Sequence, residues 1–196
     1  VDETLMRFVN IYDKETLSLK VRKEVDGEPK PATASEYAFT IESTSAKDSE
    51  GRDIEGYSYK STEKVTTSNT ADATFGGFVY YQPGTYTYRL KEVEPEADKK
   101  APGITYDTTE HELVVCVEQD KDNGLEITSV TCDGKKVVDY LNDPVATITN
   151  IYKQTTIQFA GTKILNGAAI KDYAGKFKFQ INQADENGDE ISGFKS

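Results

Sequence analysis

The chain has 196 residues, of which 34 are acidic and 23 are basic, and its formal net charge is −11 at pH 7. This acidic balance argues against binding to nucleic acid or to an anionic membrane surface. No apolar run approaches the roughly 20 residues of a membrane span, and no signal peptide follows Val1. We therefore expect an exported protein in its mature form, or a fragment of one.

Seven strands are predicted between residues 16 and 151. Twelve Tyr, many Thr and no Trp suit an all-β chain in which apolar and polar residues alternate. Turn signals such as Asp26-Gly27 separate the strands. The strands are expected at residues 16–23, 36–41, 73–80, 84–93, 110–119, 125–132 and 145–151. Short strands at this spacing are typical of an immunoglobulin-like β-sandwich, whereas the polar segment 43–68 is expected to be an exposed excursion with room for a short helix.

Three polar residues continue rows of apolar positions. Leu17, Leu19 and Val21 lead to Lys23, the even positions of 86–90 lead to Glu92, and those of 146–148 lead to Asn150. Because strand side chains alternate between faces, each row marks one buried face. Burying these polar groups is costly unless they meet one another. The pattern therefore predicts that all three converge in one site.

Such a site has a definite chemistry. Burial lowers the pKa of a lysine and raises that of a glutamate, since each charged form loses its hydration. A neutral Lys23 amine is a nucleophile, and a protonated Glu92 can polarise the Asn150 side-chain carbonyl and shuttle protons. Attack on the Asn150 amide with loss of ammonia would leave an amide cross-link without any cofactor.

Each residue also has a simpler interpretation. Taken alone, Lys23 is explained equally well by a lysine whose aliphatic stem lies along the core while its amine reaches solvent at the end of the strand. Glu92 alone suits a salt bridge at the rim, which would contribute little to stability. Lys20 is an alternative nucleophile, but it lies on the polar face of its strand.

An internal repeat runs through the chain. Asn10 corresponds to Asn150, Lys23 to Lys163, and Phe39 to Phe179, each within a similar short motif. All three pairs are offset by the same 140 residues (150 − 10, 163 − 23 and 179 − 39). One ungapped period across three motifs indicates tandem domains. We expect residues 1–12 to be the last strand of a preceding repeat, 13–152 a complete repeat, and 153–196 the incomplete beginning of the next.

The complete repeat resembles the pilin isopeptide-linkage domain of Gram-positive surface proteins, the type found in streptococcal T-antigen major pilins. Four stretches carry the resemblance: 23–27 (KEVDG), 86–92 (YTYRLKE), 102–109 (PGITYDTT) and 149–152 (TNIY). It implies a CnaB-type sandwich in which Lys23 lies on the first strand, Asn150 on the adjacent, parallel last strand, and Glu92 on the facing sheet. Lys163 and Asn10 match the same motif in the partial repeats as potential cross-link residues.

The expected function is a structural stalk or repeat module of a cell-wall-anchored adhesin or pilus, with its anchor outside this segment. A Lys23–Asn150 isopeptide bond assisted by Glu92 would stiffen it, and its partners would be neighbouring repeats. The alternative is a binding module whose loops, including 43–68, contact a host protein or glycan. We found no aromatic cluster or metal-ligand spacing in 43–68 to favour that alternative. A turnover enzyme is disfavoured for want of a catalytic motif.

Two cysteines flank a predicted hairpin turn at Lys121–Gly124. Folding about that turn would bring Cys116 and Cys132 roughly opposite each other, and a disulfide is compatible with an exported protein. The alternative is a pair of half-buried thiols. His111 is the only histidine and lies in a predicted strand. No metal or cofactor is predicted.

Overall fold

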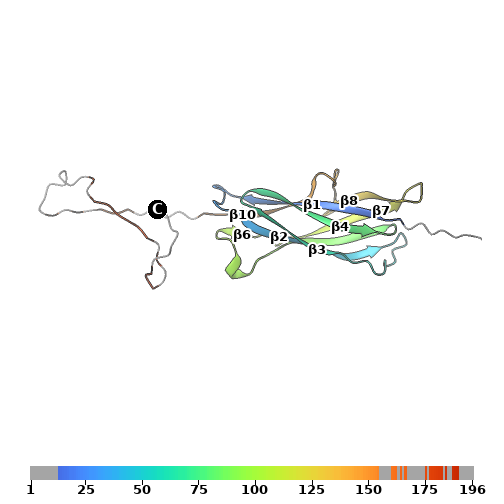
Figure 1. Ribbon diagram of the computed structural model, residues 1–196, viewed down its shortest axis with the longest axis horizontal. Helices are drawn as coiled ribbons and strands as arrows, with labels where there is room; N and C mark the ends of the chain where they lie inside the picture. The colour runs from blue at the N-terminus through green and yellow to red at the C-terminus, as the bar shows by residue number, and fades with distance from the viewer. Residues whose placement is uncertain are drawn as a thin grey trace, which may run out of the picture. The chain divides into compact units, whose positions relative to one another are not determined.

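The computed structural model describes residues 13–154 without a gap, followed by 160–162, 164, 166, 175, 177–182, 184 and 187–189. The chain divides into two compact units, Val1–Thr155 and Thr156–Ser196. Every named strand lies in the first unit (Figure 1). In the second unit the described residues are exposed, including Ile164, Phe179 and Ile181. Within the described residues, no helix is long and apolar enough to cross a membrane.

The first sheet has four strands in the order β4-β1-β10-β6. Their bounds are β4 Thr70–Tyr80, β1 Glu15–Asp26, β10 Pro144–Tyr152 and β6 Ile104–Thr105. The first strand, β1, pairs with the last, β10, in parallel, and it pairs with β4 in antiparallel fashion. The predicted parallel adjacency of the first and last strands is confirmed.

The second sheet has six antiparallel strands in the order β3-β2-β5-β7-β8-β9. Their bounds are β3 Lys60–Thr67, β2 Ser35–Lys47, β5 Gly84–Val93, β7 Glu110–Gln119, β8 Leu125–Cys132 and β9 Lys135–Lys136. One 3-10 turn, η1 at Ala97–Lys99, follows β5. The sheets form the expected all-β, immunoglobulin-like sandwich.

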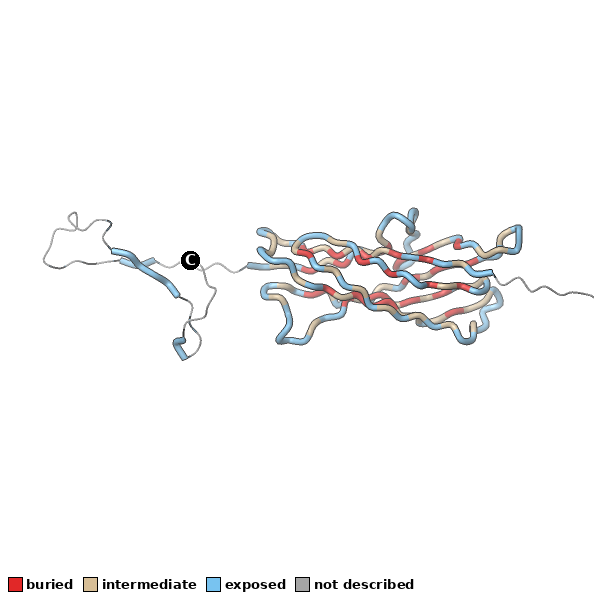
Figure 2. Tube along the Cα trace, in the orientation of Figure 1, coloured by how far each residue is buried: buried red, intermediate tan, exposed pale blue. Residues whose placement is uncertain are grey.

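The core lies between the two sheets (Figure 2). Strand β1 alternates buried and outward residues along its whole length, and β5 does the same. This period of two is what places one apolar row of each strand in the core. The fully buried members of these rows include Leu19, Val21, Tyr86, Tyr88 and Leu90, with 0–1% of their surface exposed.

The segment 43–68 differs from the prediction. Residues 43–47 extend β2, and Lys60–Thr67 form β3, which pairs with β2, so only 48–59 remain an excursion, and they contain no helix. Strand β3 escaped detection because it is an edge strand whose residues are nearly all polar and only Thr67 is buried. The excursion also carries aromatic residues that pack on the sandwich: the Tyr59 and Phe78 rings stack at 3.9 Å.

The buried row of β10 also needs a correction. We expected Ala146 to face inward, but Val145 is buried and Ala146 is only half-buried. The β1–β10 register shifts here, from Lys20 opposite Pro144 to Val21 opposite Ala146. The extra residue is a β-bulge, which reverses the inward parity before Ile148.

Candidate functional site

Lys23, Glu92 and Asn150 lie together in the core. Lys23 and Asn150 are 0% exposed and Glu92 is 5% exposed. Lys23 Nζ donates to Glu92 Oε2 at 2.9 Å, and Asn150 Nδ2 donates to Glu92 Oε1 at 2.8 Å. The two oxygens of one carboxyl group therefore contact the amine and the carboxamide at the same time.

Strand register explains how three distant residues meet. Lys23 continues the inward row of β1, and in the parallel ladder Lys23 lies opposite Ile148 while Val25 lies opposite Asn150. Asn150 is thus two residues further along the same face, within reach of a long lysine side chain. Glu92 continues the inward row of β5, paired with Phe39 of β2, and reaches the same point from the facing sheet.

The orientation of the Asn150 amide is set by a backbone donor. The Asp107 N–H donates to Asn150 Oδ1 at 2.8 Å. Because an N–H requires an acceptor, the carbonyl oxygen faces Asp107 and the amide nitrogen faces Glu92. This arrangement differs from our expectation that Glu92 polarises the carbonyl. The carboxyl group lies on the nitrogen that would leave as ammonia, and the backbone N–H lies on the oxygen.

Electrostatics favour the uncharged forms of the pair. Burial lowers the pKa of the Lys23 amine, and burial likewise raises the pKa of the Glu92 carboxyl, although the hydrogen bond between them opposes both shifts. Aromatic rings complete the surroundings, since Lys23 Nζ lies 4.8 Å from the Tyr37 ring centroid and 6.0 Å from that of Phe39. Burial opposes the charged forms of both groups, whereas the ring faces and the hydrogen bond to Glu92 favour the charged amine.

The loop between η1 and β7 holds Asp107 in place. Its Tyr106 ring packs at 6.1 Å from Tyr37, and the Tyr106 hydroxyl accepts the Ala101 N–H at 3.1 Å. The Lys153 N–H donates to Gly103 O at 2.9 Å, which ties the loop to the end of β10. Gly103 has a φ of 76°, and a Cβ there would lie 2.7 Å from Lys153 O, so only glycine fits. The 102–109 motif carries part of the family resemblance, but the sequence did not predict that this loop contacts Asn150.

The other candidate residues lie elsewhere. Lys20 is on the outer row of β1 and donates to Asn142 O at 3.0 Å, away from Glu92. Asn10 and Lys163, the potential cross-link residues of the partial repeats, fall outside the described residues.

The candidate disulfide is not formed, because both cysteines are free. Cys116 pairs with Ser129 rather than with Cys132, and Cys132 pairs with Leu113. Cys132 is buried on the inward row of β8, whereas Cys116 lies between the buried Val115 and Val117 and so points to the other face. Thiols on opposite faces of a sheet cannot be bridged, and our expectation of opposed cysteines was wrong.

The domain is thus a sandwich whose first and last strands are parallel neighbours and whose core holds an amine, a carboxyl and a carboxamide in contact. Residues 19–153 match the family described as Spy0128-like isopeptide containing domain (FctA), and the chain belongs to that family. The family match confirms the resemblance to Gram-positive pilin domains that the sequence motifs indicated.

The solved structures to which this chain is similar include streptococcal major pilins. The major pilin from Streptococcus pyogenes is 24% identical, with a TM-score of 0.49 and coverage of 74% of this chain and 51% of that one. The major pilin protein from Streptococcus pyogenes serotype GAS13637 is 20% identical, with a TM-score of 0.49 and coverage of 72% and 54%. The chain matches about half the length of these pilins. No curated protein matches the chain.

Proposed function

We propose that the sandwich is a structural module of a Gram-positive pilus or surface adhesin, stiffened by an amide bond that forms by itself between Lys23 and Asn150. One observation carries the proposal: a buried amine and a buried carboxamide contact the same carboxyl group, that of Glu92, at 2.9 and 2.8 Å. Membership of an isopeptide-containing family supports the same conclusion.

The reaction begins with the neutral Lys23 amine and the protonated Glu92. Lys23 Nζ attacks Asn150 Cγ, and the carbonyl π electrons move to Oδ1. Glu92 Oε2 takes a proton from Nζ, while the Glu92 proton passes from Oε1 to Nδ2. The Cγ–Nδ2 bond then breaks and ammonia leaves. One amine and one amide become one secondary amide and one ammonia, and Glu92 ends protonated as it began.

The Asp107 N–H stabilises the charge that develops on Oδ1. It already lies 2.8 Å from that oxygen, and its loop is fixed by its own hydrogen bonds. A preorganised backbone donor in a site that excludes water favours the tetrahedral intermediate over the starting amide. Fixed geometry also gives the amine a high effective concentration, which suffices for a reaction that occurs once per chain. The module is therefore not a turnover enzyme.

The bond would protect the domain against force. If tension enters at β1 and leaves at β10, it passes through Lys23 and Asn150 and bypasses the residues between them. The bond joins two residues that are 127 positions apart in the sequence (150 − 23). In the loop-entropy description of a disulfide, a closed loop of that length stabilises the folded state by about 5 kcal/mol. Covalent resistance to pulling and to proteases adds to this.

The 140-residue period supports a wider arrangement. We infer that residues 13–152 are one complete repeat, 1–12 the end of the preceding one and 153–196 the beginning of the next. Neighbouring repeats would be the partners in an extracellular array attached to the cell wall, with the anchor outside this segment.

The test is the intact mass of the reduced, denatured protein. We expect a mass one ammonia below that of the sequence, and the full sequence mass for Lys23→Ala, Asn150→Ala and Glu92→Ala. Lys20→Ala is the matched control, because it removes a lysine from the outer row of the same strand and should leave the deficit intact. A wild-type protein with its full sequence mass would contradict the proposal.

A second candidate function, loop-mediated binding of a host protein or glycan, is supported by a hollow of about 310 Å³ beside the 48–59 excursion. Its lining includes Tyr57, Tyr59, Tyr81 and Tyr86, so our expectation that no aromatic cluster lies at 43–68 was wrong. Tyrosine rings combine an apolar face with a polar hydroxyl, which suits binding to sugars. Replacing 54–59 with a Gly/Ser linker separates the two functions. Loss of ligand binding with the ammonia deficit intact would favour binding as the task of this loop.

A further inference from the structure

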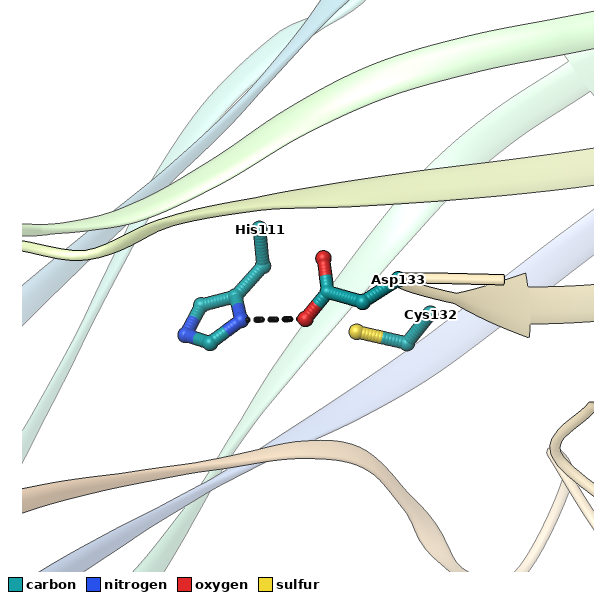
Figure 3. A group of neighbouring side chains, drawn as sticks. All are labelled: His111, Cys132 and Asp133. Atoms are coloured by element: carbon teal, nitrogen blue, oxygen red, sulfur yellow. Dashed lines mark hydrogen bonds and ion pairs between the residues drawn. The ribbon is translucent and has the colours of Figure 1, made fainter. Parts of the chain in front are cut away.

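Three side chains of the types that bind metals meet at one end of the second sheet (Figure 3). His111 lies at the beginning of β7, Cys132 ends β8, and Asp133 begins the turn into β9. The antiparallel register places Cys132 opposite Leu113, two residues from His111. One ligand atom from each of the three side chains lies within 4.8 Å of the others, and His111 Nδ1 is 2.8 Å from Asp133 Oδ2.

Hydrogen bonds to the backbone of Glu112 hold Asp133 in place. Asp133 Oδ1 accepts the Glu112 N–H at 2.9 Å, and the Asp133 N–H donates to Glu112 O at 2.8 Å. Asp133 also has a φ of 49°, in the left-handed region, which turns its carboxylate back toward His111. Such outer hydrogen bonds orient a carboxylate before any ion binds.

Cys132 is 8% exposed and the His111 side chain 16%, so two of the three groups are largely withdrawn from solvent. His111 Nε2 is buried and has no hydrogen-bond partner among the described residues. The group borders a hollow of about 480 Å³ that also touches β9 and the first residues of β10. That space admits a water molecule or an added ligand next to the three side chains.

A nucleophilic cysteine is a poor explanation for the group. Cys132 is buried and lies beside the Asp133 carboxylate, whereas reactive cysteines lie in partly exposed, electropositive surroundings. The mixture of sulfur, imidazole nitrogen and carboxylate oxygen instead matches the ligands that zinc takes in proteins.

We propose that His111, Cys132 and Asp133 bind a divalent transition-metal ion of the zinc type, with a fourth position open to the hollow. The thiol S–H bond breaks, its proton passes to solvent, and sulfur bonds the metal as a thiolate. The imidazole binds through Nδ1, the ring nitrogen that faces Asp133. Tetrahedral ligands at about 2.0–2.3 Å lie roughly 3.3–3.7 Å apart, so Asp133 must move by less than about 1 Å from His111. Its side chain, 49% exposed, has room to do so.

The experiment is a cobalt(II) titration of the untagged full chain in metal-free buffer. We expect thiolate-to-cobalt charge-transfer absorption that saturates at one equivalent and disappears when one equivalent of zinc is added. Cys132→Ser and His111→Ala should abolish the absorption. Cys116→Ser is the matched control, because the other thiol lies on the opposite face of the sheet and should leave the absorption unchanged. Far-UV circular dichroism checks that each variant is folded.

A second measurement needs no variant. The chain has one histidine, so its imidazole gives a single set of NMR signals, and one equivalent of zinc should shift them. Unchanged imidazole signals, no cobalt absorption, or absorption that persists in folded Cys132→Ser would each overturn the proposal. Equal loss in Cys116→Ser would also overturn it, since the signal would then not come from this group.

Discussion

Replacing Glu92 by glutamine tests the proton shuttle without changing the packing. Glutamine has nearly the same shape and volume, and it keeps an oxygen for one of the two hydrogen bonds made by Glu92 Oε1 and Oε2. Its amide cannot take a proton from Lys23 or pass one to Asn150. We therefore expect Glu92→Gln to fold but to retain its ammonia, so its mass would equal that of its sequence.

The size of the accompanying stability loss follows from the loop that the bond closes. A cross-link between residues 127 positions apart contributes about 5 kcal/mol in the loop-entropy description. For a domain of about this length, 1 kcal/mol corresponds to a Tm change of about 2–4 °C. The Tm of Glu92→Gln should therefore lie about 10–20 °C below that of the wild-type protein.

The assay pairs intact mass with a calorimetric melt of the same sample. Glu94→Gln is the control, since it makes the same substitution two residues away at an exposed ion pair with Lys100. We expect it to keep the ammonia deficit and to lose less than about 1 kcal/mol. A full ammonia deficit in Glu92→Gln would refute the shuttle, and a missing deficit with an unchanged Tm would refute the stabilising role of the bond.

Three further predictions follow from the same geometry. Asp107→Pro removes the N–H that contacts Asn150 Oδ1 and should slow ammonia loss by about 10²–10³-fold. Asp107→Ala keeps that N–H and should react at nearly the normal rate. Mass spectrometry of freshly synthesised chains measures both rates. In such chains the rate should depend on pH as a bell, because the amine is protonated below the lowered pKa of Lys23 and the acid is ionised above the raised pKa of Glu92. When Glu92→Gln is pulled through its termini in a single-molecule experiment, unfolding should lengthen the chain by about 440 Å. This length is about 3.5 Å for each of the 126 residues between Lys23 and Asn150. The wild-type domain should release none of this length, because the bond bypasses those residues.

Much of the site could be predicted because strand periodicity is a local property. Lys23 and Glu92 each continue an apolar row within a single strand, and the sequence alone displays that row. Asn150 was also identified, although the bulge at Val145 made part of its row misleading. Asn150 was still placed on the correct face, because the bulge precedes Ile148 and does not change the faces to which Ile148 and Asn150 point.

The features that were missed depend on pairing between strands. The Asp107 N–H belongs to a loop without periodicity, and nothing in the sequence places it on Asn150 Oδ1. His111 and Cys132 are 21 residues apart (132 − 111), and only the β7–β8 register brings them together. The same register separates Cys116 from Cys132. A hairpin turn predicts that two strands pair, but a shift of one residue in their register decides which side chains share a face.

The dependence on register would also tie the proposed cross-link to correct folding. Lys23, Glu92 and Asn150 come from β1, β5 and β10, which belong to two different sheets. A one-residue slip of any of these strands would turn its reactive side chain to the opposite face. The lowered pKa of Lys23 and the raised pKa of Glu92, on which the proposed reaction depends, also arise only from burial in the folded domain. An unfolded or misregistered chain therefore has neither the contacts nor the protonation states for the reaction, and the bond would form only where it locks the native arrangement of the two sheets.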